Sequence, residues 1–303
     1  MKCSQCSSEA VIHIRYSGSS LCSRHFVKFV EKRVQKDLKK QFNLQGSARK
    51  TIAVAVSGGK DSAAALHIMT RTYKKRRDVS LVAVLIDEGI SGYRDRAIPH
   101  AERLCASEGV PLEVFSFKEM FGQTLDSIVP GIREKTPCSY CGVLRRRALN
   151  VAARKVGASY LATGINLDDV AQSFLMNISK GDVDRLARMA PHARVQEGLV
   201  PRILPMRTIP EKECYLYAHL MNLDYYHGEC PYAEQAQRNT FRKVVYELED
   251  AFPGTRYGML SSLERISEAV RTRGSGSVRR CSRCGEPSSE DVCEVCRMLQ
   301  EFS

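Results

Sequence analysis

Cysteine is the residue type in this chain with the most obvious capacity for chemistry, because twelve of the 303 residues are cysteines. The N-terminal residues MKCSQCSSEA form neither an apolar leader nor an amphipathic transit pattern, so we expect a cytoplasmic protein. Thiols stay reduced there, which favours metal ligation or catalysis over disulfides. Cys105 and Cys214 stand alone in apolar, helix-like stretches and are expected to be small buried hydrophobes. The other ten fall into three groups.

Two of these groups, one near each end of the chain, have the spacing of structural zinc sites. In each, two ligand pairs are separated by a loop, which is typical of a closed tetrahedral site. Modules this small have too little hydrophobic core to fold without a metal, which favours zinc. The alternative is that the thiols are paired in sequence but bind no metal. The predicted ligands are Cys3, Cys6, Cys22 and His25 for the first zinc and Cys281, Cys284, Cys293 and Cys296 for the second.

A phosphate-binding loop is predicted at 57–62, directly after an apolar run. The loop lacks the GxxxxGK[ST] pattern of a Walker A motif. Its two glycines nevertheless allow backbone N–H groups to close on a phosphate, and the following helix presents its positive N-terminus. The side chains add two hydroxyls and one ammonium. The loop residues are Ser57, Gly58, Gly59, Lys60, Asp61 and Ser62.

Short apolar runs alternate with helical patterns along the middle of the chain. Strands are predicted at 52–57, 80–87, 112–117 and 159–164, and helices at 94–108, 119–129, 141–156, 167–179 and within 237–270. This order favours an α/β fold with a doubly wound parallel sheet. Such sheets bind ligands beyond the carboxyl ends of their strands, so we expect the chemistry at 57–62, 86–89 and 164–169.

The chain divides on the sequence into one main domain at 46–272 and small zinc modules at 1–45 and 273–303, the second preceded by a Gly/Ser/Arg linker at 271–280. A basic amphipathic helix at 26–42 either contacts RNA or links two modules. The net charge of +12 suits a polyanionic partner, nucleic acid first, although a solubilising surface is the alternative. No window is apolar enough to predict a membrane span.

Several motifs together carry a resemblance to a known family. SGGKDS resembles the signature of the PP-loop ATP pyrophosphatases, which cleave ATP between the α and β phosphates and adenylate a carbonyl oxygen. The surrounding motifs are similar to those of the tRNA 2-thiouridine synthetases of the TtuA type and their wobble-thiolation relatives, over nearly the whole chain. These motifs are DEGISGYR at 87–94, PCSYCG at 137–142, TGINLDD at 163–169 and GECPYA at 228–233.

The resemblance implies an ATP site and a set of catalytic residues. The expected ATP-binding residues are Ala55, Ser57, Gly58, Gly59, Lys60, Asp61, Ser62, Ile86, Arg145, Gly164 and Asp169. Those expected in catalysis are Lys60, Asp61, Arg145 and Asp169. A carboxylate such as Asp169 beside the phosphates can hold Mg²⁺ or assist proton transfer. An N-cap is the structural alternative in this motif, and it suits Asp168 better.

The third cysteine group, Cys138, Cys141 and Cys230, holds a [4Fe–4S] cluster in the family. An iron without a protein ligand could then bind hydrosulfide. Judged by spacing alone, a third zinc site that pairs His227 with Cys230 is an equal alternative.

The chain departs from the family pattern at two positions. Ile165 stands where the family usually has His, so a role of that His in RNA or nucleotide contact is not expected here. Arg145 stands where the family has Lys. Arginine keeps the positive charge but cannot transfer protons near neutral pH, so we expect Arg145 to stabilise the adenylate electrostatically.

The function implied by the resemblance is a tRNA 2-thiouridine synthase acting on position 34 or 54. The sulfur donor would be sulfide, a persulfide or a ubiquitin-like thiocarboxylate protein, and a homodimer is the implied assembly. The alternatives are cytidine 2-thiolation or amine ligation on tRNA, and a non-enzymatic zinc-finger RNA-binding protein. The last would leave the phosphate loop and the central cysteines without a purpose.

Overall fold

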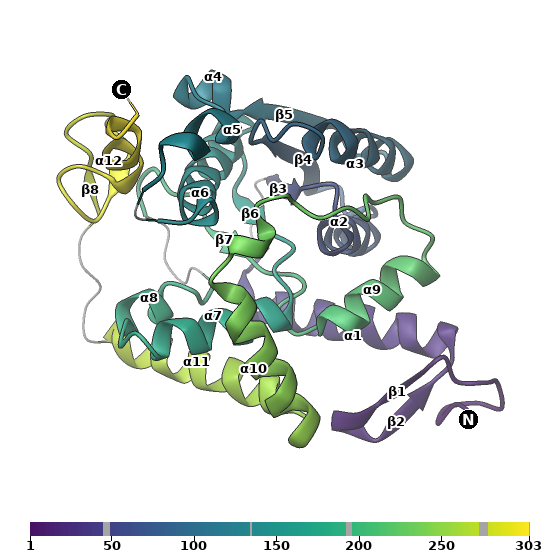
Figure 1. Ribbon diagram of the computed structural model, residues 1–303. Coiled ribbons are helices and arrows are strands. Elements are labelled where there is room, and N and C mark those ends of the chain that lie inside the picture. Colours follow the sequence, from purple (N-terminus) through teal and green to yellow (C-terminus); the bar gives the residue numbers. More distant parts are fainter. Residues whose placement is uncertain (45–48, 134, 192–195, 273–277, 303) are drawn as a thin grey trace.

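The computed structural model describes residues 1–44, 49–133, 135–191, 196–272 and 278–302. Its centre is a parallel sheet in the strand order β5-β4-β3-β6-β7 (Figure 1). The strands are β3 (Lys50–Val56), β4 (Val79–Asp87), β5 (Leu112–Ser116), β6 (Tyr160–Ala162) and β7 (Arg202–Ile203). The four predicted strands are therefore confirmed, whereas the two-residue β7 is too short to leave a periodic pattern in the sequence.

Helices cover both faces of this sheet. On β3, Ile52 and Val54 pack in the core formed with α2 (Lys60–Tyr73) and α3 (Arg94–Glu108). Ala53, between them, packs in the second core with α6 (Pro137–Lys155) on the opposite face. This alternation confirms the doubly wound fold, because successive side chains of a strand point to opposite faces. Cys105 and Cys214 are both buried as expected, 2% and 0% exposed.

One helix prediction was wrong in its boundaries. The segment 119–129 forms two short helices, α4 (Phe117–Phe121) and α5 (Leu125–Ile128), because Gly122 ends the first in a left-handed conformation at φ +73°. The helical block predicted at 237–270 is confirmed and consists of two helices, α10 (Arg238–Ala251) and α11 (Thr255–Thr272). Between them lies Pro253, whose ring cannot donate a backbone hydrogen bond. The remaining helices of the main domain are α7 (Leu167–Ile178), α8 (Val183–Ala187) and α9 (Glu211–Leu220).

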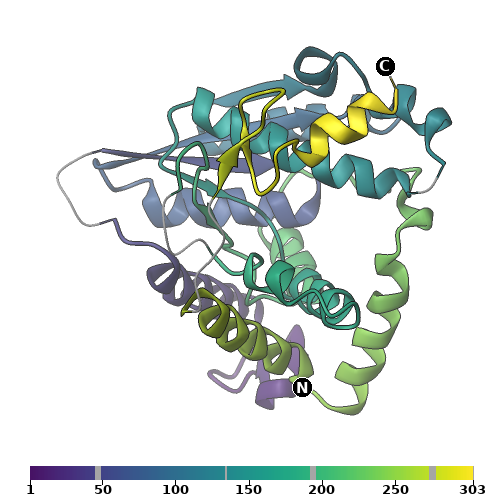
Figure 2. The same ribbon diagram turned by 90° about the vertical axis from the view of Figure 1, so that its left-hand side faces the viewer.

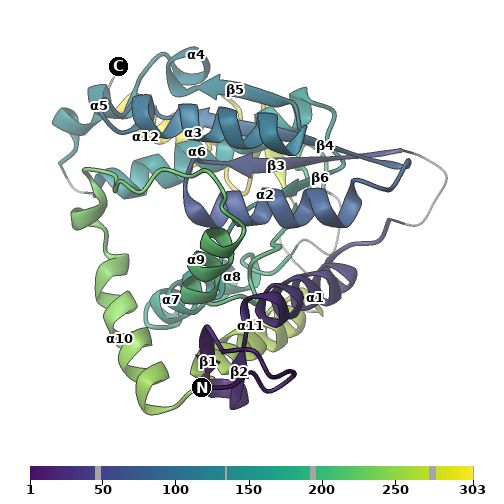
Figure 3. The ribbon, with the colours of Figure 1, turned by 90° about the vertical axis from the view of Figure 1, so that its right-hand side faces the viewer.

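The N-terminal segment forms a β1–β2 hairpin (Ile12–Ile14 and Ser19–Leu21) followed by α1 (Ser23–Gln41). The amphipathic helix is confirmed, since Phe26, Val30, Val34 and Leu38 form its buried stripe. This stripe belongs to the same core as α2 and α9, so the N-terminal module is continuous with the main core (Figure 3). The predicted boundary at 45/46 falls at residues outside the described ranges.

The C-terminal segment contains β8 (Arg279–Arg280), β9 (Pro287–Ser288) and α12 (Glu294–Gln300). It lies on α6, where Cys281, Cys293 and Met298 join the core of the sheet's second face (Figure 2). The centre of the predicted linker, 273–277, lies outside the described residues. Searched over the described part of the chain, no helix is long and apolar enough to cross a membrane.

Candidate functional site

The predicted phosphate loop is a tightly bonded turn between β3 and α2. The Ser57 amide donates to Ser62 Oγ at 3.1 Å, and the two hydroxyl oxygens lie 3.1 Å apart. Gly58 has φ +82°, and a Cβ there would lie 2.3 Å from the carbonyl oxygen of Ala97, so only glycine fits. Gly59 is the N-cap of α2, and the N-terminus of that helix is a ready anion-binding position.

A second loop meets the phosphate loop where the order of the sheet reverses. β3 and β6 are neighbours in space, although β4 and β5 come between them in sequence, and ligands bind at such switch points. The contact is close, because a Cβ on Gly164 would lie 2.9 Å from the Asp61 carbonyl and the Ser62 amide. Ile165, next along this loop, is 36% exposed. The structure thus brings 57–62 and 164–169 together.

The N-cap of α7 is Asn166, so its assignment to Asp168 was wrong. Asn166 Oδ1 accepts from the Asp169 amide at 2.9 Å, and the Asp169 carboxylate accepts in return from the Asn166 amide at 3.3 Å. Asp168 is only 1% exposed; it accepts from the Glu211 amide at 2.7 Å and lies 3.2 Å from Arg256 Nε. The Asp168 carboxylate therefore links the N-terminus of α7 to the N-terminus of α9.

Asp61 is a carboxylate with unused bonding capacity beside the phosphate loop. Its Oδ1 is buried and has no hydrogen-bond partner among the described residues. Burial raises the pKa of the Asp61 carboxyl; the Lys60 ammonium opposes this shift and the nearby Asp169 carboxylate adds to it. A bound water or a bound ion can satisfy a buried oxygen of this kind. Mg²⁺ prefers carboxylate oxygen and phosphate together, so the donors present fit that ion.

Lys60 is held between two carboxylates. Its Nζ lies 2.9 Å from Glu211 Oε1 and 3.2 Å from Asp61 Oδ2, and Tyr246 donates to the other Glu211 oxygen at 3.0 Å. Burial alone would lower the pKa of Lys60, but the two carboxylates outweigh it and raise that pKa. The ammonium is therefore fully charged and is positioned by Glu211, a residue that the sequence did not single out.

The three central cysteines gather near the phosphate loop. Cys138 and Cys141 lie in the first turn of α6, which begins at Pro137. Cys230 lies on the segment between α9 and α10, and it packs against Ile90, Leu125 and Cys141 in one small apolar cluster. Cys138 Sγ lies 3.5 Å from the Tyr232 carbonyl oxygen, two residues beyond Cys230.

The segment that carries Cys230 is itself bonded to the phosphate loop. The Tyr226 amide donates to the Gly58 carbonyl at 2.7 Å, and the Tyr226 ring packs against Tyr93 with centroids 5.9 Å apart. From there the segment continues to α10 (Figure 3). The same segment of the chain therefore contacts the phosphate loop and carries Cys230.

The central cysteines do not form a third zinc tetrahedron. Within the described ranges, only the two terminal sets bring three or more Cys, His, Asp or Glu ligand atoms within 4.8 Å of one another. Zinc–thiolate bonds of about 2.3 Å require sulfurs roughly 3.8 Å apart, so a zinc site that includes His227 is not supported. The three thiols are free, and thiolates are the usual protein ligands of iron–sulfur clusters.

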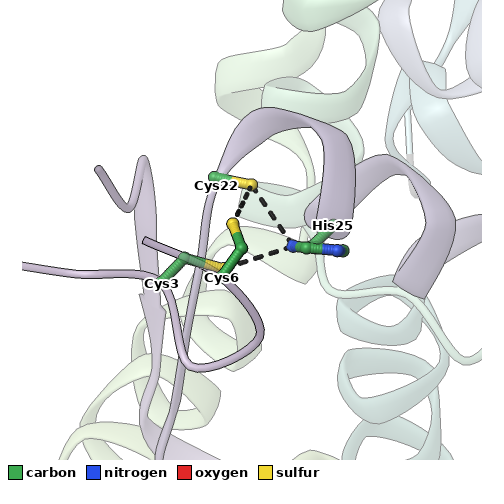
Figure 4. A group of neighbouring side chains, drawn as sticks. All are labelled: Cys3, Cys6, Cys22 and His25. Carbon is green, nitrogen blue, oxygen red and sulfur yellow. Dashed lines mark hydrogen bonds between the residues drawn. The ribbon is translucent and has the colours of Figure 1, made fainter. Parts of the chain in front are cut away.

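The terminal sets have the compact geometry of tetrahedral metal sites. Figure 4 shows the N-terminal side chains turned toward a common centre, with His25 Nδ1 3.4 Å from both Cys3 Sγ and Cys22 Sγ, and Cys6 Sγ 3.8 Å from Cys22 Sγ. In the C-terminal set the paired sulfurs lie 3.9 and 3.7 Å apart. The Cys293 amide bonds to Cys281 Sγ and, with neighbouring amides, lowers the pKa of that thiol to about 6. Both sets could hold a metal.

Replacing Cys293 by serine is expected to remove one metal per chain and to lower the melting temperature by about 5 °C or more, because the module shares its core with α6. Metal analysis and thermal unfolding measure both effects. Cys105→Ser is the matched control, since Cys105 is equally buried but belongs to neither set. Unchanged metal content in the Cys293 variant would contradict the site.

Arg145 connects the thiols to the end of the sheet. Its Nη2 lies 3.2 Å from Cys141 Sγ and its Nε 3.3 Å from Glu88 Oε1. Glu88 also bonds to Arg94, which donates to the carbonyls of Ser57 at 2.8 Å and Ile86 at 2.7 Å. Glu88 and Arg94 are part of the quoted motif at 87–94, but sequence reasoning gave them no role.

Other predicted positions lie around this arrangement. Ala55 is half-buried on β3 opposite Val84, and Ile86 is 2% exposed near the end of β4. Arg238, at the start of α10, donates to Asp169 Oδ1 at 2.8 Å and was not predicted. No local pattern in the sequence marks it, because its partner lies about seventy residues away.

The chain is similar to known proteins over its whole length. The sequence matches the PP-loop domain over residues 21–249 and the N-terminal LIM domain of the 2-thiouridine synthetase TtuA over residues 2–27. It is 37% identical to the tRNA 2-thiolation protein NcsA of Haloferax volcanii, covering 100% of this chain and 99% of that protein. It is 36% identical to the cytoplasmic tRNA 2-thiolation protein 1 of Saccharomyces cerevisiae, covering 98% and 85%.

A solved structure matches over the whole chain. This is the U34-tRNA thiolase NcsA from Methanococcus maripaludis with its [4Fe–4S] cluster. The TM-score is 0.87 at 33% identity, and the match covers 100% of this chain and 97% of that one.

Proposed function

Because the chain belongs to the PP-loop family of tRNA 2-thiolation proteins, ATP-dependent sulfurtransferases, we propose that it converts a tRNA uridine to 2-thiouridine in two steps. In the first, the uridine C2 oxygen attacks the α-phosphorus of ATP, the bond to the bridging oxygen breaks, and pyrophosphate leaves. In the second, a sulfur nucleophile attacks C2, and AMP leaves with the former uridine oxygen. No oxidant or reductant is needed if the sulfur arrives as sulfide.

The observation that carries this proposal is the bonding of the Cys230 segment to the nucleotide loop through Tyr226 and Gly58. An enzyme that only adenylated RNA would have no need for three thiols beside its phosphate loop. A zinc-finger RNA-binding protein would need neither. Adenylation and sulfur transfer must act on the same base in succession, so their sites have to adjoin.

We assign the phosphates of ATP to the loop 57–62 and the helix N-terminus that follows it. Ala55, Ile86 and Gly164 frame the nucleoside, and Asp61 and Asp169 hold Mg²⁺. Cys138, Cys141 and Cys230 hold a [4Fe–4S] cluster, which when bound would supply an iron free to carry sulfur. Arg145 stabilises the negative charge of the adenylate. The two terminal ligand sets hold structural zinc.

We propose position 34 as the target, because the match to a U34-tRNA thiolase extends over the whole chain. The cytoplasm is the proposed compartment, as in the names of the eukaryotic relatives. Sulfide, a persulfide or a ubiquitin-like thiocarboxylate protein would supply the sulfur, and a homodimer is the expected assembly.

The direct test uses the anaerobically reconstituted full chain with tRNA, ATP, Mg²⁺ and sulfide. Mass spectrometry of nuclease fragments of the tRNA should find 2-thiouridine at position 34. The reaction should also release AMP and pyrophosphate in amounts equal to the 2-thiouridine formed. Thiolated cytidine, or 2-thiouridine at position 54 alone, would overturn the assignment of the target. Tight tRNA binding without pyrophosphate release would overturn the enzymatic function.

Arginines from several elements suit the phosphates of the RNA. Burial and the positive charges of Arg202 and Arg185, followed by those of Arg145 and Arg238, lower the pKa of Arg146 to about 10. These side chains come from α6, α8, β7 and the start of α10. Carboxylates pair with part of this charge, Glu88 with Arg145 and Asp169 with Arg238, and phosphates of the RNA would neutralise more of it.

Arg146→Ala is expected to weaken tRNA binding about equally for all sequences and to reduce the slope of log K against log salt by about 1. Fluorescence anisotropy between about 50 and about 200 mM salt measures the slope. Arg279→Ala, an exposed arginine on β8, is the control and should change neither quantity. An equal loss in both variants would mean that only the overall charge of +12 matters.

A further inference from the structure

A continuous line of polar contacts joins the nucleotide loop to the cysteines. Arg94 donates to the Ser57 carbonyl at 2.8 Å and bonds to one oxygen of Glu88. The other Glu88 oxygen lies 3.3 Å from Arg145 Nε, and Arg145 Nη2 lies 3.2 Å from Cys141 Sγ. Glu88 is the only residue of this line that contacts both arginines.

We propose that Glu88 is a positioning residue that sets Arg145 between the nucleotide loop and the thiol site. This proposal rests on the function proposed above. It names the residue that holds the phosphate loop and the thiol site in a fixed position relative to each other. Arg145 is the residue that acts on the reacting groups. Glu88 acts only through Arg145, and Arg94 ties Glu88 to the loop.

Burial makes Glu88 a fixed point. Glu88 is 2% and Arg94 4% exposed, and charges this deeply buried persist only when they are paired and hydrogen-bonded. Arg94 also holds the Ile86 carbonyl at 2.7 Å, so the pair is anchored to the ends of both β3 and β4. The carboxylate therefore cannot move without losing its pairing with Arg94, which is itself bonded to the ends of both strands.

Arg145 differs, because its side chain is 45% exposed. An arginine side chain without a fixed partner samples many rotamers, and restricting it to one costs conformational entropy. If Glu88 did not fix the Arg145 rotamer beforehand, this cost would add to the activation free energy. Its guanidinium contacts Glu88 and Cys141. One carboxylate facing two guanidiniums leaves one positive charge unbalanced, and the contact of Arg145 Nη2 with Cys141 Sγ directs this charge toward the thiol site.

The decisive experiment is a double-mutant cycle on the reconstituted full chain. Glu88→Gln and Arg145→Met are made singly and together, and single-turnover thiolation is measured at saturating ATP. Glu88→Gln is expected to slow thiolation about 10-fold to 100-fold, the size of effect that a misplacement of about 1 Å produces. In the Arg145→Met background the same change should cost less than about 2-fold.

A spectroscopic readout is independent of turnover. Iron and sulfide content should be unchanged, while both single variants should alter the electron paramagnetic resonance spectrum of the reduced cluster in the same way, because each removes the guanidinium from Cys141. Glu213→Gln is the matched control: Glu213 is 4% exposed and pairs with Arg33 at 3.8 Å, on the side of α9. It should leave the spectrum unchanged.

Glu88→Asp covers the case in which the glutamine variant does not fold. It keeps the charge beside Arg94 but withdraws the carboxylate by about 1.5 Å, so the 3.3 Å contact to Arg145 Nε is lost. The proposal would be overturned if Glu88→Gln slowed thiolation by the same factor in the Arg145→Met background as in the wild-type chain. It would also be overturned if neither Glu88 variant slowed thiolation. A wild-type chain that makes no 2-thiouridine would instead overturn the proposed function, whatever the spectra show.

Discussion

Cys230→Ser is expected to abolish thiolation while sparing adenylation. Iron and sulfide should fall from about four each per chain to below about one, because two thiolates on one helical turn cannot hold the cluster alone. Thiolation should fall by at least about 1000-fold, since the chemical step loses its sulfur carrier. Pyrophosphate release on adding tRNA should stay within about twofold, because the phosphate loop depends on no thiolate for its own bonding.

The control for this variant is His227→Ala. The His227 ring packs on Tyr225 with centroids 4.5 Å apart and belongs to neither compact ligand set, so its loss should change neither metal content nor rate. A third zinc after anaerobic purification, lost in both variants, would contradict the sulfur-transfer mechanism. It would leave the ATP assignment intact.

Lys60→Ala is expected to reduce tRNA-dependent pyrophosphate release about 100-fold to 1000-fold, the effect of removing one preorganised charge from a phosphate site. The loss has a second component, because Asp61 and Glu211 then face the phosphates without the ammonium that lies 3.2 and 2.9 Å from them. Thiolation should fall in parallel, and iron and zinc content should not change.

Lys118→Ala is the control for lost positive charge, since Lys118 is exposed on α4 beyond the edge strand β5. Quenched-flow measurement of pyrophosphate separates the two steps of the reaction. Near-normal release from the Lys60 variant would remove this residue from the nucleotide site.

Several features could be predicted because their causes are local. The stripe of Phe26, Val30, Val34 and Leu38 follows from helical periodicity and is buried as expected. The turn from β3 into α2 follows from the glycine pair at 58–59 after an apolar strand. The terminal ligand sets are closed by short loops, and the structure brings each together.

Other features could not be predicted because their partners are distant in sequence. Glu211 holds Lys60 from about 150 residues away, and Arg238 reaches Asp169 across about seventy. Glu88 and Arg94 lie within the motif at 87–94, but their burial and their pairing with each other depend on the tertiary structure. The N-cap of α7 is Asn166 and not Asp168, because the buried Asp168 side chain is paired with Arg256.

The sequence by itself determined the chemistry available to this protein: a phosphate loop, closed metal sets, basic charge and three further thiols. It did so because spacing within one turn or one short loop fixes which side chains can meet. Only the tertiary structure decided that Cys230 joins Cys141, about ninety residues earlier, and that Tyr226 fastens this segment to Gly58. The physical reason is that parallel strands place loops distant in sequence at one edge of a sheet, and the sheet order that selects those loops depends on packing over the whole chain.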